Sequence, residues 1–302
     1  AGHVLVRVEA AGFCHHDAAI MSGVLRRGVN LPRVLGHEVA GTVVGAGDGV
    51  PAEALGTRVV AMPGSLGHRL DGGFAEYLLL PWEGAVPLPF GLAPEQAALL
   101  ACPMGVALKA VEDVARVQPG ETVIVTGVSG GLGVHAAQVA YAAGATVIGV
   151  TGSEEKVPRL EGMPWLSGVI APGDVQWDEM ARALTDDEGA EVVIDTGGGD
   201  LQRCLGALAK RGRLVLMGQM GAGASTLFPA EAVFREAQIL GSLGVERRHV
   251  ERVAQLVRGG TLQPVVERTL PLGADSLKAA FHAMESRALL GRMVLLGGDA
   301  RE

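Results

Sequence analysis

The 302-residue sequence predicts a doubly wound parallel α/β sheet combined with a second, mostly antiparallel β domain. Three observations support this prediction. Between residues 121 and 241, short β-like runs alternate with helix-like runs, as in a parallel sheet built from strand–helix–strand units. Before residue 100, β-like runs are separated by Gly and Pro, and helical periodicity is scarce. Apolar residues make up 48% of the chain and charged residues 19%, so we expect a sizeable core.

The first hundred residues carry the runs that predict the antiparallel domain. We expect strands at 4–9, 38–44, 57–61 and 73–80. A helical stretch then begins at Ala93 and continues towards Val114, with Pro94 tolerated in its first turn. These elements predict an irregular β domain that ends on a helix.

The middle of the chain carries the alternating pattern. We expect strands at 122–126, 145–150, 191–195, 213–217 and 238–241, and helices at 131–143, 154–160, 200–209 and 229–236. Residues 122–153 contain no Asp, Glu, Lys or Arg and are long enough to span a bilayer. Glycines break them into a strand, a helix and a strand, which is typical of a buried βαβ unit. After Gly244 we expect an amphipathic helix and further β-like runs, which end at 292–296.

Composition and charge exclude several classes of function. The formal net charge is −8, whereas the phosphate contacts of a nucleic-acid-binding protein need a basic footprint. No Lys/Arg-rich run of membrane-surface type occurs in the sequence. Three widely spaced cysteines form no disulfide framework and favour a reducing, cytoplasmic compartment. Because a strand-like run follows Ala1 almost directly, we expect the natural chain to carry a preceding segment.

A glycine-rich turn joins the expected strand 122–126 to the helix that follows it. Glycines let the backbone turn tightly and approach a pyrophosphate, and the helix N-terminus offers free N–H groups to the phosphates. Strand, turn, helix and second strand occur in the order that a dinucleotide-binding site requires. The alternative is a turn kept only for helix–sheet packing. The predicted cofactor-binding residues of the turn are Gly127, Ser129, Gly130, Gly131, Leu132 and Gly133. Gly218, which follows the expected strand 213–217, is a further predicted cofactor-binding residue.

The end of the second strand indicates which dinucleotide binds. An acid there would bind a ribose 2′-OH and favour NAD, but the sequence reads Val-Thr-Gly-Ser-Glu-Glu-Lys over 150–156. The hydroxyls of Thr151 and Ser153, together with the charge of Lys156, can hold a 2′-phosphate. The alternative is that Ser153 only caps the helix and Lys156 is solvated. We therefore predict NADP(H) in preference to NAD(H).

Cys14, His37 and Cys102 are candidate metal ligands in the β-rich part of the chain. Thiolate and imidazole groups suit Zn²⁺, and three protein ligands with one open position is the arrangement of a catalytic zinc. Spacing this wide is not specific by itself. Both cysteines can be small core residues, and a single His more often satisfies a core hydrogen bond.

The motifs around these residues resemble those of the zinc-containing medium-chain alcohol dehydrogenase family. The segment Gly36-His37-Glu38, with Gly41 and Gly47 behind it, is similar to the zinc signature of that family. The Cys-x-x-Asp element at 14–17, the segment 72–77 and the turn 127–133 follow in the family's order, and the resemblance covers essentially the whole chain. It implies a GroES-like domain at 1–103 and 248–302, a Rossmann domain at 104–247, and a substrate site between them.

The resemblance also implies a role for each residue around the metal. One catalytic zinc would be held by Cys14, His37 and Cys102. Glu38 corresponds to an acid that can exchange onto the metal, and Asp17 to a residue that orients the ring of His37. His15 lies where the family often places a contact to the cofactor phosphates. His16 occupies the position, usually Ser or Thr, that relays the proton of the alcohol.

Two features depart from the family pattern. A His at position 16 can relay protons directly, since its ordinary pKa of about 6.5 suits acid–base work, or it reflects a different substrate or a blocked relay. The alternative for His15 and His16 is a solvent-facing pair. Many relatives carry a four-cysteine lobe that holds a second zinc, but 61–73 contain no cysteine, so such a zinc is excluded. We expect His68 in this short segment to be exposed.

These residues predict a zinc-dependent oxidoreductase that transfers a hydride between NADP(H) and an alcohol, aldehyde or ketone. The predicted catalytic group is His16, Asp17 and Glu38. Two alternatives stay open: a quinone or enoyl reductase acting on a C=C bond, whose relatives generally lack zinc ligands, and a non-catalytic nucleotide-binding relative. Because relatives often pair through an edge strand of the Rossmann sheet, here near 238–243, we expect a homodimer or homotetramer. We expect no membrane or nucleic-acid partner.

Overall fold

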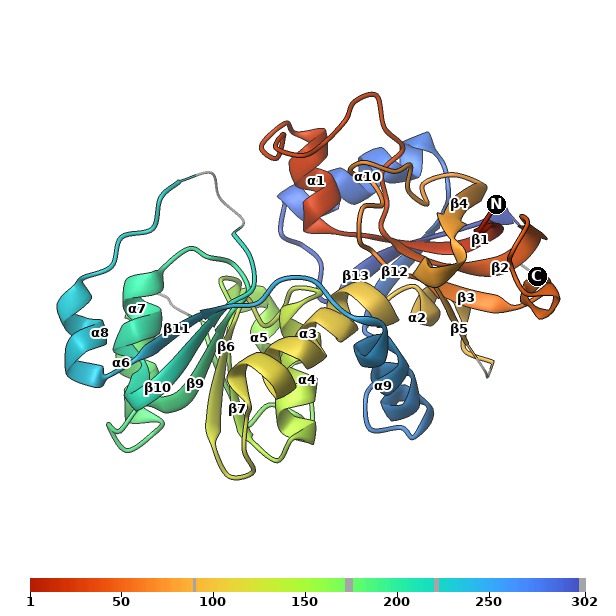
Figure 1. The fold of residues 1–302 in the computed structure, drawn as a ribbon. Coiled ribbons are helices and arrows are strands. Elements are labelled where there is room, and N and C mark those ends of the chain that lie inside the picture. The colour runs from red at the N-terminus through yellow and green to blue at the C-terminus, as the bar shows by residue number, and fades with distance from the viewer. Residues whose placement is uncertain (89–90, 172–175, 220–222, 299–302) are drawn as a thin grey trace. The chain divides into compact units, whose positions relative to one another are not determined.

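The computed structural model describes residues 1–88, 91–171, 176–219 and 223–298 (Figure 1). The chain divides into two compact units, which are described separately below. The antiparallel unit comprises 1–105 and 244–302, and the parallel unit comprises 106–243. The sequence predicts domain boundaries at 103/104 and 247/248.

A seven-stranded sheet forms the centre of the antiparallel unit. Its strands are β1 (His3–Phe13), β2 (Glu38–Ala46), β3 (Arg58–Ala61), β4 (Tyr77–Pro81), β5 (Ala85–Pro87), β12 (Val266–Pro271) and β13 (Arg292–Leu296). The strand order is β12-β13-β1-β2-β3-β5, and β4 also pairs with β1. All pairs are antiparallel except β12 with β13. The sheet therefore brings β13, from the end of the chain, beside β1 from its beginning.

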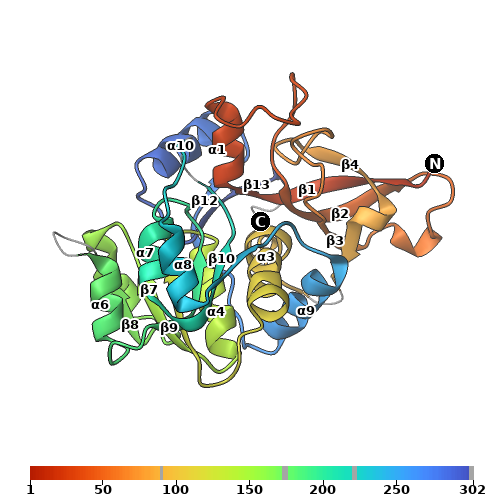
Figure 2. The same cartoon turned by 60° about the vertical axis from the view of Figure 1, so that its left-hand side comes forward.

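The helices of the antiparallel unit are short, apart from two near its C-terminal end. They are α1 (His15–Met21), η1 (Ala52–Ala54), η2 (Trp82–Gly84), α2 (Pro94–Ala97), the π-helical η3 (Leu100–Gly105), α9 (Arg247–Arg258) and α10 (Ala274–Glu285). Alternate residues of β1, such as Val4, Val6 and Val8, are buried in the core, as a sheet with one solvated face requires. Helices α1 and α10 lie side by side and cover a second small core around Phe13 and Met293 (Figures 1 and 2).

Two expectations for the antiparallel unit are wrong in detail. Residues 73–76 form no strand, because the backbone N–H groups of Gly72 and Gly73 donate to the carbonyls of Val34 and Gly36 instead of a neighbouring strand. The helical stretch from Ala93 towards Val114 is not one regular helix. It changes between α-helical and π-helical pieces, and Pro103, which has no N–H to donate, lies in the first π-helical piece.

The parallel unit is a six-stranded, all-parallel sheet. Its strands are β6 (Thr122–Thr126), β7 (Thr146–Val150), β8 (Gly168–Ile170), β9 (Ala190–Asp195), β10 (Leu208–Leu216) and β11 (Gln238–Gly241). They follow the order β11-β10-β9-β6-β7-β8, the strand order of a doubly wound nucleotide-binding sheet. The order reverses between β6 and β9, which is where such sheets bind their ligands.

Helices cover both faces of the parallel sheet. They are α3 (Val106–Leu108), the π-helical η4 (Lys109–Ala115), α4 (Gly133–Ala142), η5 (Glu154–Lys156), α5 (Val157–Glu161), α6 (Trp177–Ala183), α7 (Leu201–Gly206) and α8 (Pro229–Arg235). Figure 2 shows α3 and α4 on one side of the sheet and α6, α7 and α8 on the other. This double covering explains why the strands are apolar on both faces.

The expected helix at 200–209 ends at Gly206, and Leu208 already belongs to β10. Leu208 packs in the same core cluster as Leu205 and Cys204, but it does so from the strand. Its position four residues after Cys204 therefore does not reflect a continuing helix. Cys204 is a core residue, with 1% of its surface exposed. The stretch 122–153 is strand, turn, helix and strand. Within the described ranges, no helix is both long and apolar enough to cross a membrane.

Candidate metal centre and cofactor-binding turn

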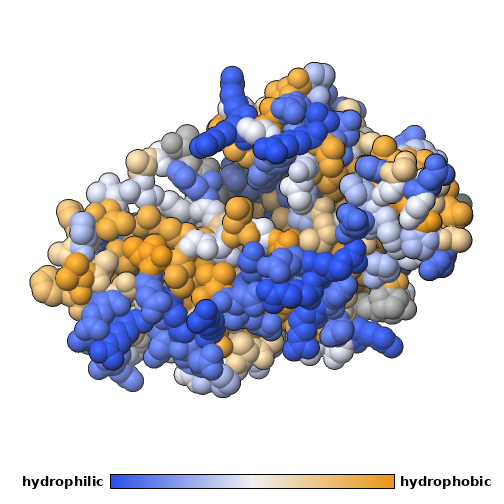
Figure 3. All heavy atoms as spheres, in the orientation of Figure 1, coloured by the Kyte–Doolittle hydropathy of each residue, from blue (hydrophilic) through white to orange (hydrophobic). Residues whose placement is uncertain are grey.

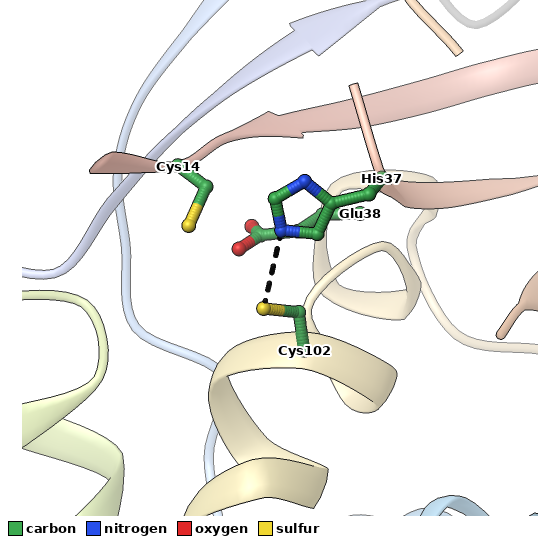
Figure 4. A group of neighbouring side chains, drawn as sticks. All are labelled: Cys14, His37, Glu38 and Cys102. Carbon is green, nitrogen blue, oxygen red and sulfur yellow. Dashed lines mark hydrogen bonds between the residues drawn. The ribbon is translucent and has the colours of Figure 1, made fainter. Parts of the chain in front are cut away.

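Four side chains of the antiparallel unit converge on one point (Figure 4). Cys14 is the residue between β1 and α1, His37 and Glu38 lie at the start of β2, and Cys102 lies in η3. One potential ligand atom of each side chain lies within 4.8 Å of those of the others. The sequence predicts this set as metal ligands, and the fold brings all four together.

Glycines of two separate motifs make this arrangement possible. Gly36 has a φ of +93°, and a Cβ at this position would lie 2.7 Å from the ring of Phe74. A Cβ on Gly72 would lie 2.2 Å from the carbonyl oxygen of Gly36. The segment 72–74 therefore packs directly on the turn that presents His37. The two motifs are separate in the sequence but form one structural element.

Asp17 contacts the groups that position the metal ligands. Its Oδ2 accepts a hydrogen bond from the backbone N–H of Cys14 at 3.0 Å, and its Oδ1 accepts one from Gly36 at 3.0 Å. The Oδ1 atom also lies 3.4 Å from Nδ1 of His37, close enough for an ion pair although not aligned for a hydrogen bond. Asp17 is fully buried. It therefore holds the backbone beside two ligands and faces the ring nitrogen of His37 that points away from Cys102.

The two cysteines have opposite ionisation tendencies. The hydrogen bond from Cys102 lowers the pKa of Cys14 well below its ordinary value, with Arg292 and His37 adding to the effect. The same contact and burial raise the pKa of Cys102. Its Sγ lies 3.4 Å from Nε2 of His37 (Figure 4). Burial opposes a charge on His37, but Asp17 and Cys14 raise its pKa well above the ordinary value. These opposite shifts favour a thiolate at Cys14 beside an imidazolium at His37. A metal binds thiolates and neutral imidazoles, so its binding would release protons from His37 and Cys102.

Glu38 lies behind the ligand set against a buried arginine. Its Oε1 lies 2.8 Å from Nη2 of Arg292 on β13, and both residues are at most 5% exposed. The two atoms are at ion-pair distance without hydrogen-bond alignment. A Cβ on Gly12 would lie 2.2 Å from Oε2 of Glu38, so only glycine leaves room for the carboxylate here. Burial raises the pKa of Glu38 to about 7, against the opposing charge of Arg292.

Sequence reasoning misses Arg292 as part of this site. Arg292 belongs to a β-like run near the end of the chain. An arginine among apolar residues in such a run indicates a side chain that faces solvent. Pairing of β1 with β13 in register, with Phe13 opposite Met293, brings Arg292 to Glu38. A charged residue next to buried strand positions is the one signal that could have indicated it.

His16 lies in the first turn of α1, beside the ligand set. Its ring meets the ring of His37 edge-on, with centroids 5.2 Å apart and planes at 78°. Its Nε2 atom is hydrogen-bonded to Nε2 of His68. Burial, followed by the charge of His37, lowers the pKa of His16 below its ordinary value. His15 and His16 are both half-buried, and the ring of His16 contacts those of His37 and His68.

The expectation that His68 is merely exposed is wrong. His68 is half-buried and contacts His16. Burial lowers its pKa too. No sequence signal relates the two histidines, because the contact depends on how the segment 65–74 folds.

The glycine-rich turn after β6 is built as the sequence predicts. Gly127 has a φ of +62°. A Cβ on Gly133 would lie 2.3 Å from the carbonyl oxygen of Gly127, so the first turn of α4 packs on the turn itself. The side chain of Ser129 is buried, and its Oγ accepts a hydrogen bond from Thr151 at 3.2 Å. A hydrogen bond between side chains therefore joins the turn to the end of β7.

Residues at the end of β7 differ in exposure. Thr151 is 1% exposed and Lys156 is 8% exposed, so the idea that Lys156 is solvated is wrong. Glu154 and Glu155 are exposed. Ser153 precedes η5 but makes no side-chain capping bond. Its hydroxyl is therefore not used to cap this short helix.

A hydrogen-bond network at the ends of β6 and β9 was not foreseen from the sequence. Asp195 is buried, and its carboxylate accepts hydrogen bonds from the hydroxyl of Thr126 at 2.5 Å and from the backbone of Gly198 at 2.8 Å. Thr196 donates to the carbonyl of Thr126 at 2.8 Å. A Cβ on Gly198 would lie 2.6 Å from the carbonyl of Gly218. Gly218 thus lies at the reversal point of the strand order together with the glycine-rich turn.

The predicted site residues fall into two groups. His16, Asp17 and Glu38 lie with the metal ligands in the antiparallel unit, as does His15. The other predicted cofactor residues lie in the parallel unit, around the turn after β6 and the ends of β7 and β10.

Comparison with known proteins tests the family assignment. The model of the alcohol dehydrogenase GroES-like domain matches residues 1–90, and that of the zinc-binding dehydrogenase matches residues 131–259. An NAD-dependent alcohol dehydrogenase of Saccharolobus solfataricus is 31% identical over 97% of this chain and 92% of its own. The chain belongs to the zinc-type medium-chain dehydrogenase/reductase family.

Relatives named for different activities resemble the chain to a similar degree. An acryloyl-coenzyme A reductase of Metallosphaera sedula is 30% identical over 97% of this chain and 92% of its own. A crystal structure of an NAD-dependent alcohol dehydrogenase has a TM-score of 0.87 and 31% identity, over 98% of this chain and 92% of its own. The comparisons therefore support the assignment of this medium-chain dehydrogenase/reductase as an oxidoreductase. They also support its division into a GroES-like part and a Rossmann-like part.

Proposed function

We propose that this oxidoreductase transfers a hydride reversibly between NADP(H) and a small alcohol, aldehyde or ketone, with one catalytic zinc. The observation that carries the proposal is the convergence of Cys14, His37 and Cys102 on one point. A medium-chain reductase that works without metal has no need for two thiols and an imidazole around one point. The GroES-like part would therefore hold the metal and the Rossmann-like part the cofactor.

The residues present fit a zinc ion. Two thiols and an imidazole are the ligands that zinc prefers, and three protein ligands leave one position open for a substrate. Asp17 faces the remaining ring nitrogen of His37, as outer partners of zinc-bound histidines do. Bound at Cys14, His37 and Cys102, zinc would supply a Lewis acid that polarises the substrate oxygen.

The remaining chemistry would fall to neighbouring side chains and the cofactor. The nicotinamide carries the hydride, while the protein positions it. His16 would accept the alcohol proton during oxidation and return it during reduction. Glu38, held by Arg292, has a carboxylate oxygen within 4.8 Å of the three ligand atoms and would be the acid that exchanges onto the metal.

NADP(H) is the cofactor that the end of β7 favours. Position 151 is a threonine. A carboxylate at this position would bind the ribose diol and repel a 2′-phosphate. Ser153 keeps its hydroxyl free of capping, and Lys156 carries a charge one turn away. Glu154 and Glu155 point to solvent and so oppose a phosphate only weakly. His15 would add a contact to the cofactor phosphates.

A second candidate function is reduction of a C=C bond conjugated to a carbonyl. The resemblance to an acryloyl-coenzyme A reductase favours it. Zinc would then still polarise the carbonyl oxygen, and the hydride would go to carbon further along the conjugated system. Turnover with unsaturated thioesters or enones, but none with alcohols or saturated carbonyls, would identify this activity.

We propose a homodimer as the smallest assembly, with the edge strand β11 of one copy against that of another. β11 is the last strand in the sheet order, and an edge strand offers unpaired backbone groups. Ile239 and Leu243 nearby are 41% and 89% exposed, and Phe234 on α8 is 82% exposed. Figure 3 shows apolar residues gathered over the region of α8 and β11. Light scattering of wild type against Ile239→Lys tests this pairing.

One experiment tests the function directly. Metal analysis of purified protein is combined with NADPH- and NADH-linked oxidation and reduction of a panel of alcohols, aldehydes, ketones and enones. We expect zinc and NADPH-linked turnover of alcohols or carbonyls. Tight cofactor binding with no turnover of any compound would favour a non-catalytic nucleotide-binding protein.

A further inference from the structure

The segment 65–74 is a built element of the antiparallel unit. It folds onto the segment 30–36 through backbone hydrogen bonds, including one from Asn30 to the carbonyl of His68 at 3.0 Å. The carboxylate of Asp71 accepts a further bond from the backbone N–H of Val34 at 3.1 Å. Leu66 is 3% exposed and belongs to the core of the sheet. The backbone of His68 is therefore fixed at both sides and at its own carbonyl.

The side chain of His68 is directed at one partner. Its ring lies against that of His16, with centroids 4.3 Å apart and planes at 32°, and the two Nε2 atoms are hydrogen-bonded. The ring of His16 in turn meets the metal-ligand ring of His37 edge-on. Three imidazoles thus lie in a row from a metal ligand to a surface segment.

A hydrogen bond between two imidazole nitrogens constrains both rings. One Nε2 must carry the hydrogen and the other must accept it. This contact holds each ring in one orientation and couples the tautomers of the two rings, so the Nδ1 atom of His16 takes the role complementary to that of its Nε2. Without His68, the ring of His16 would turn about its side-chain bonds and exchange its tautomers.

We propose that His68 is a positioning residue that fixes the orientation and tautomer of His16 beside the metal centre. The proposal rests on the proposed function, in which His16 handles the substrate proton. His68 itself touches neither metal ligand nor substrate in this account. Its role parallels that of a residue that orients the second nitrogen of a catalytic imidazole.

The test compares three variants in the zinc-loaded protein. His68→Leu keeps an apolar side chain of similar bulk but no hydrogen bond, whereas His68→Gln keeps a group that can donate or accept. Arg69→Gln changes the exposed neighbouring residue and serves as the control. The ring nitrogens of His16 are read by ¹⁵N NMR, with the His16 signals assigned by their loss in His16→Gln. Zinc content, kcat and KM are measured for each protein.

We expect one dominant His16 tautomer in wild type, Arg69→Gln and His68→Gln, and a mixture in His68→Leu. We expect His68→Leu to lower kcat about 10-fold with unchanged zinc content and unchanged KM for the cofactor, and His68→Gln to restore most of it. Identical His16 spectra in wild type and His68→Leu would overturn the proposal. So would a second bound metal ion that both His68→Leu and His16→Gln remove, because the two rings would then be metal ligands.

The same data separate this proposal from the function on which it rests. If the wild type turns over no substrate, the proposed function fails, while the NMR comparison still reports whether His68 orients His16. If the enzyme is active and His16→Gln has no effect on kcat, the proton role of His16 fails. If His16→Gln lowers kcat but His68→Leu changes neither spectrum nor kcat, only the positioning role fails.

Discussion

Arg292 and Glu38 form an ion pair inside the antiparallel unit, with Nη2 of Arg292 2.8 Å from Oε1 of Glu38 and neither side chain more than 5% exposed. The pair joins β13 to β2 directly behind the metal-ligand set. Burying either of these charges without the other would lower the free energy of unfolding. The pair therefore links the fold of this unit to the chemistry of its site.

Removing only the arginine should be strongly destabilising. We expect Arg292→Met to lower the free energy of unfolding by about 3–5 kcal/mol at a pH above the folded-state pKa of Glu38, because Glu38 must then either bury an unpaired carboxylate or take up a proton. The double variant Arg292→Met/Glu38→Gln should recover much of this loss, since a neutral amide costs less to bury. Urea unfolding followed by circular dichroism measures both. A double variant no more stable than the single one would show that Glu38 does not cause the loss.

The raised pKa of Glu38 predicts a pH dependence of stability in the metal-free protein. Its pKa of about 7 in the folded state lies above the ordinary value of 4.5, so the folded state holds the proton where the unfolded state has lost it. Stability from this group is therefore greatest below pH 4.5 and falls as the pH rises towards 7. At 1.36 kcal/mol per pKa unit, the fall is about 3 kcal/mol. Urea titrations of wild type and Glu38→Gln between pH 5 and 7.5 should diverge in this sense, and parallel curves would contradict it.

The proton role of His16 predicts a step in the pH profile of oxidation. The neutral ring is the acceptor, so the rate should rise as the pH passes upward through the pKa of His16, which burial lowers below its ordinary value. In His16→Gln this step should be absent and kcat should fall by about 10²-fold or more. The zinc content of both proteins serves as the control. An unchanged profile and rate would remove His16 from the mechanism and leave proton exit to water.

Cofactor choice should follow the end of β7. We expect a higher kcat/KM with NADPH than with NADH, since one or two charge-assisted hydrogen bonds to the 2′-phosphate are worth roughly 1.5–3 kcal/mol each. Thr151→Asp should reverse the preference. Lys156→Ala should erode it and leave NADH use nearly intact, whereas Lys278→Ala, which removes an exposed charge from the other unit, should change neither. Equal or better efficiency with NADH in the wild type would refute this account of the cofactor.

The fold was predictable where local rules and the tertiary structure agree. The runs around the glycine-rich turn are β-branched or alanine-rich and end at glycines, so β6, α4 and β7 follow from periodicity alone. β8 and α6 are not predicted from the sequence because they are short, with 3 and 7 residues, too few to establish a periodic pattern. The π-helical segment that carries Cys102 could not be foreseen, because its geometry depends on how the chain accommodates Pro103.

The residues of the site likewise divide into those that the sequence identifies and those that only the fold reveals. Cys14, His37 and Cys102 were identifiable because thiols and imidazoles are rare in this chain and stand within recognisable motifs. Arg292 and His68 were not identifiable, because their roles arise from strand register and from the path of one segment. Residue type suggests chemistry, but only the fold shows which partner a common residue meets.

The zinc content of the wild type and of Cys102→Ser tests the central claim most directly. Protein prepared without added chelator should contain one zinc per chain. Cys102→Ser should lose the metal and the activity but keep the circular dichroism spectrum and cooperative unfolding of the wild type, because a catalytic zinc is not the main support of a large core. A wild type with no zinc or with two zinc ions per chain, or a Cys102→Ser variant that keeps its metal and its turnover, would contradict the account.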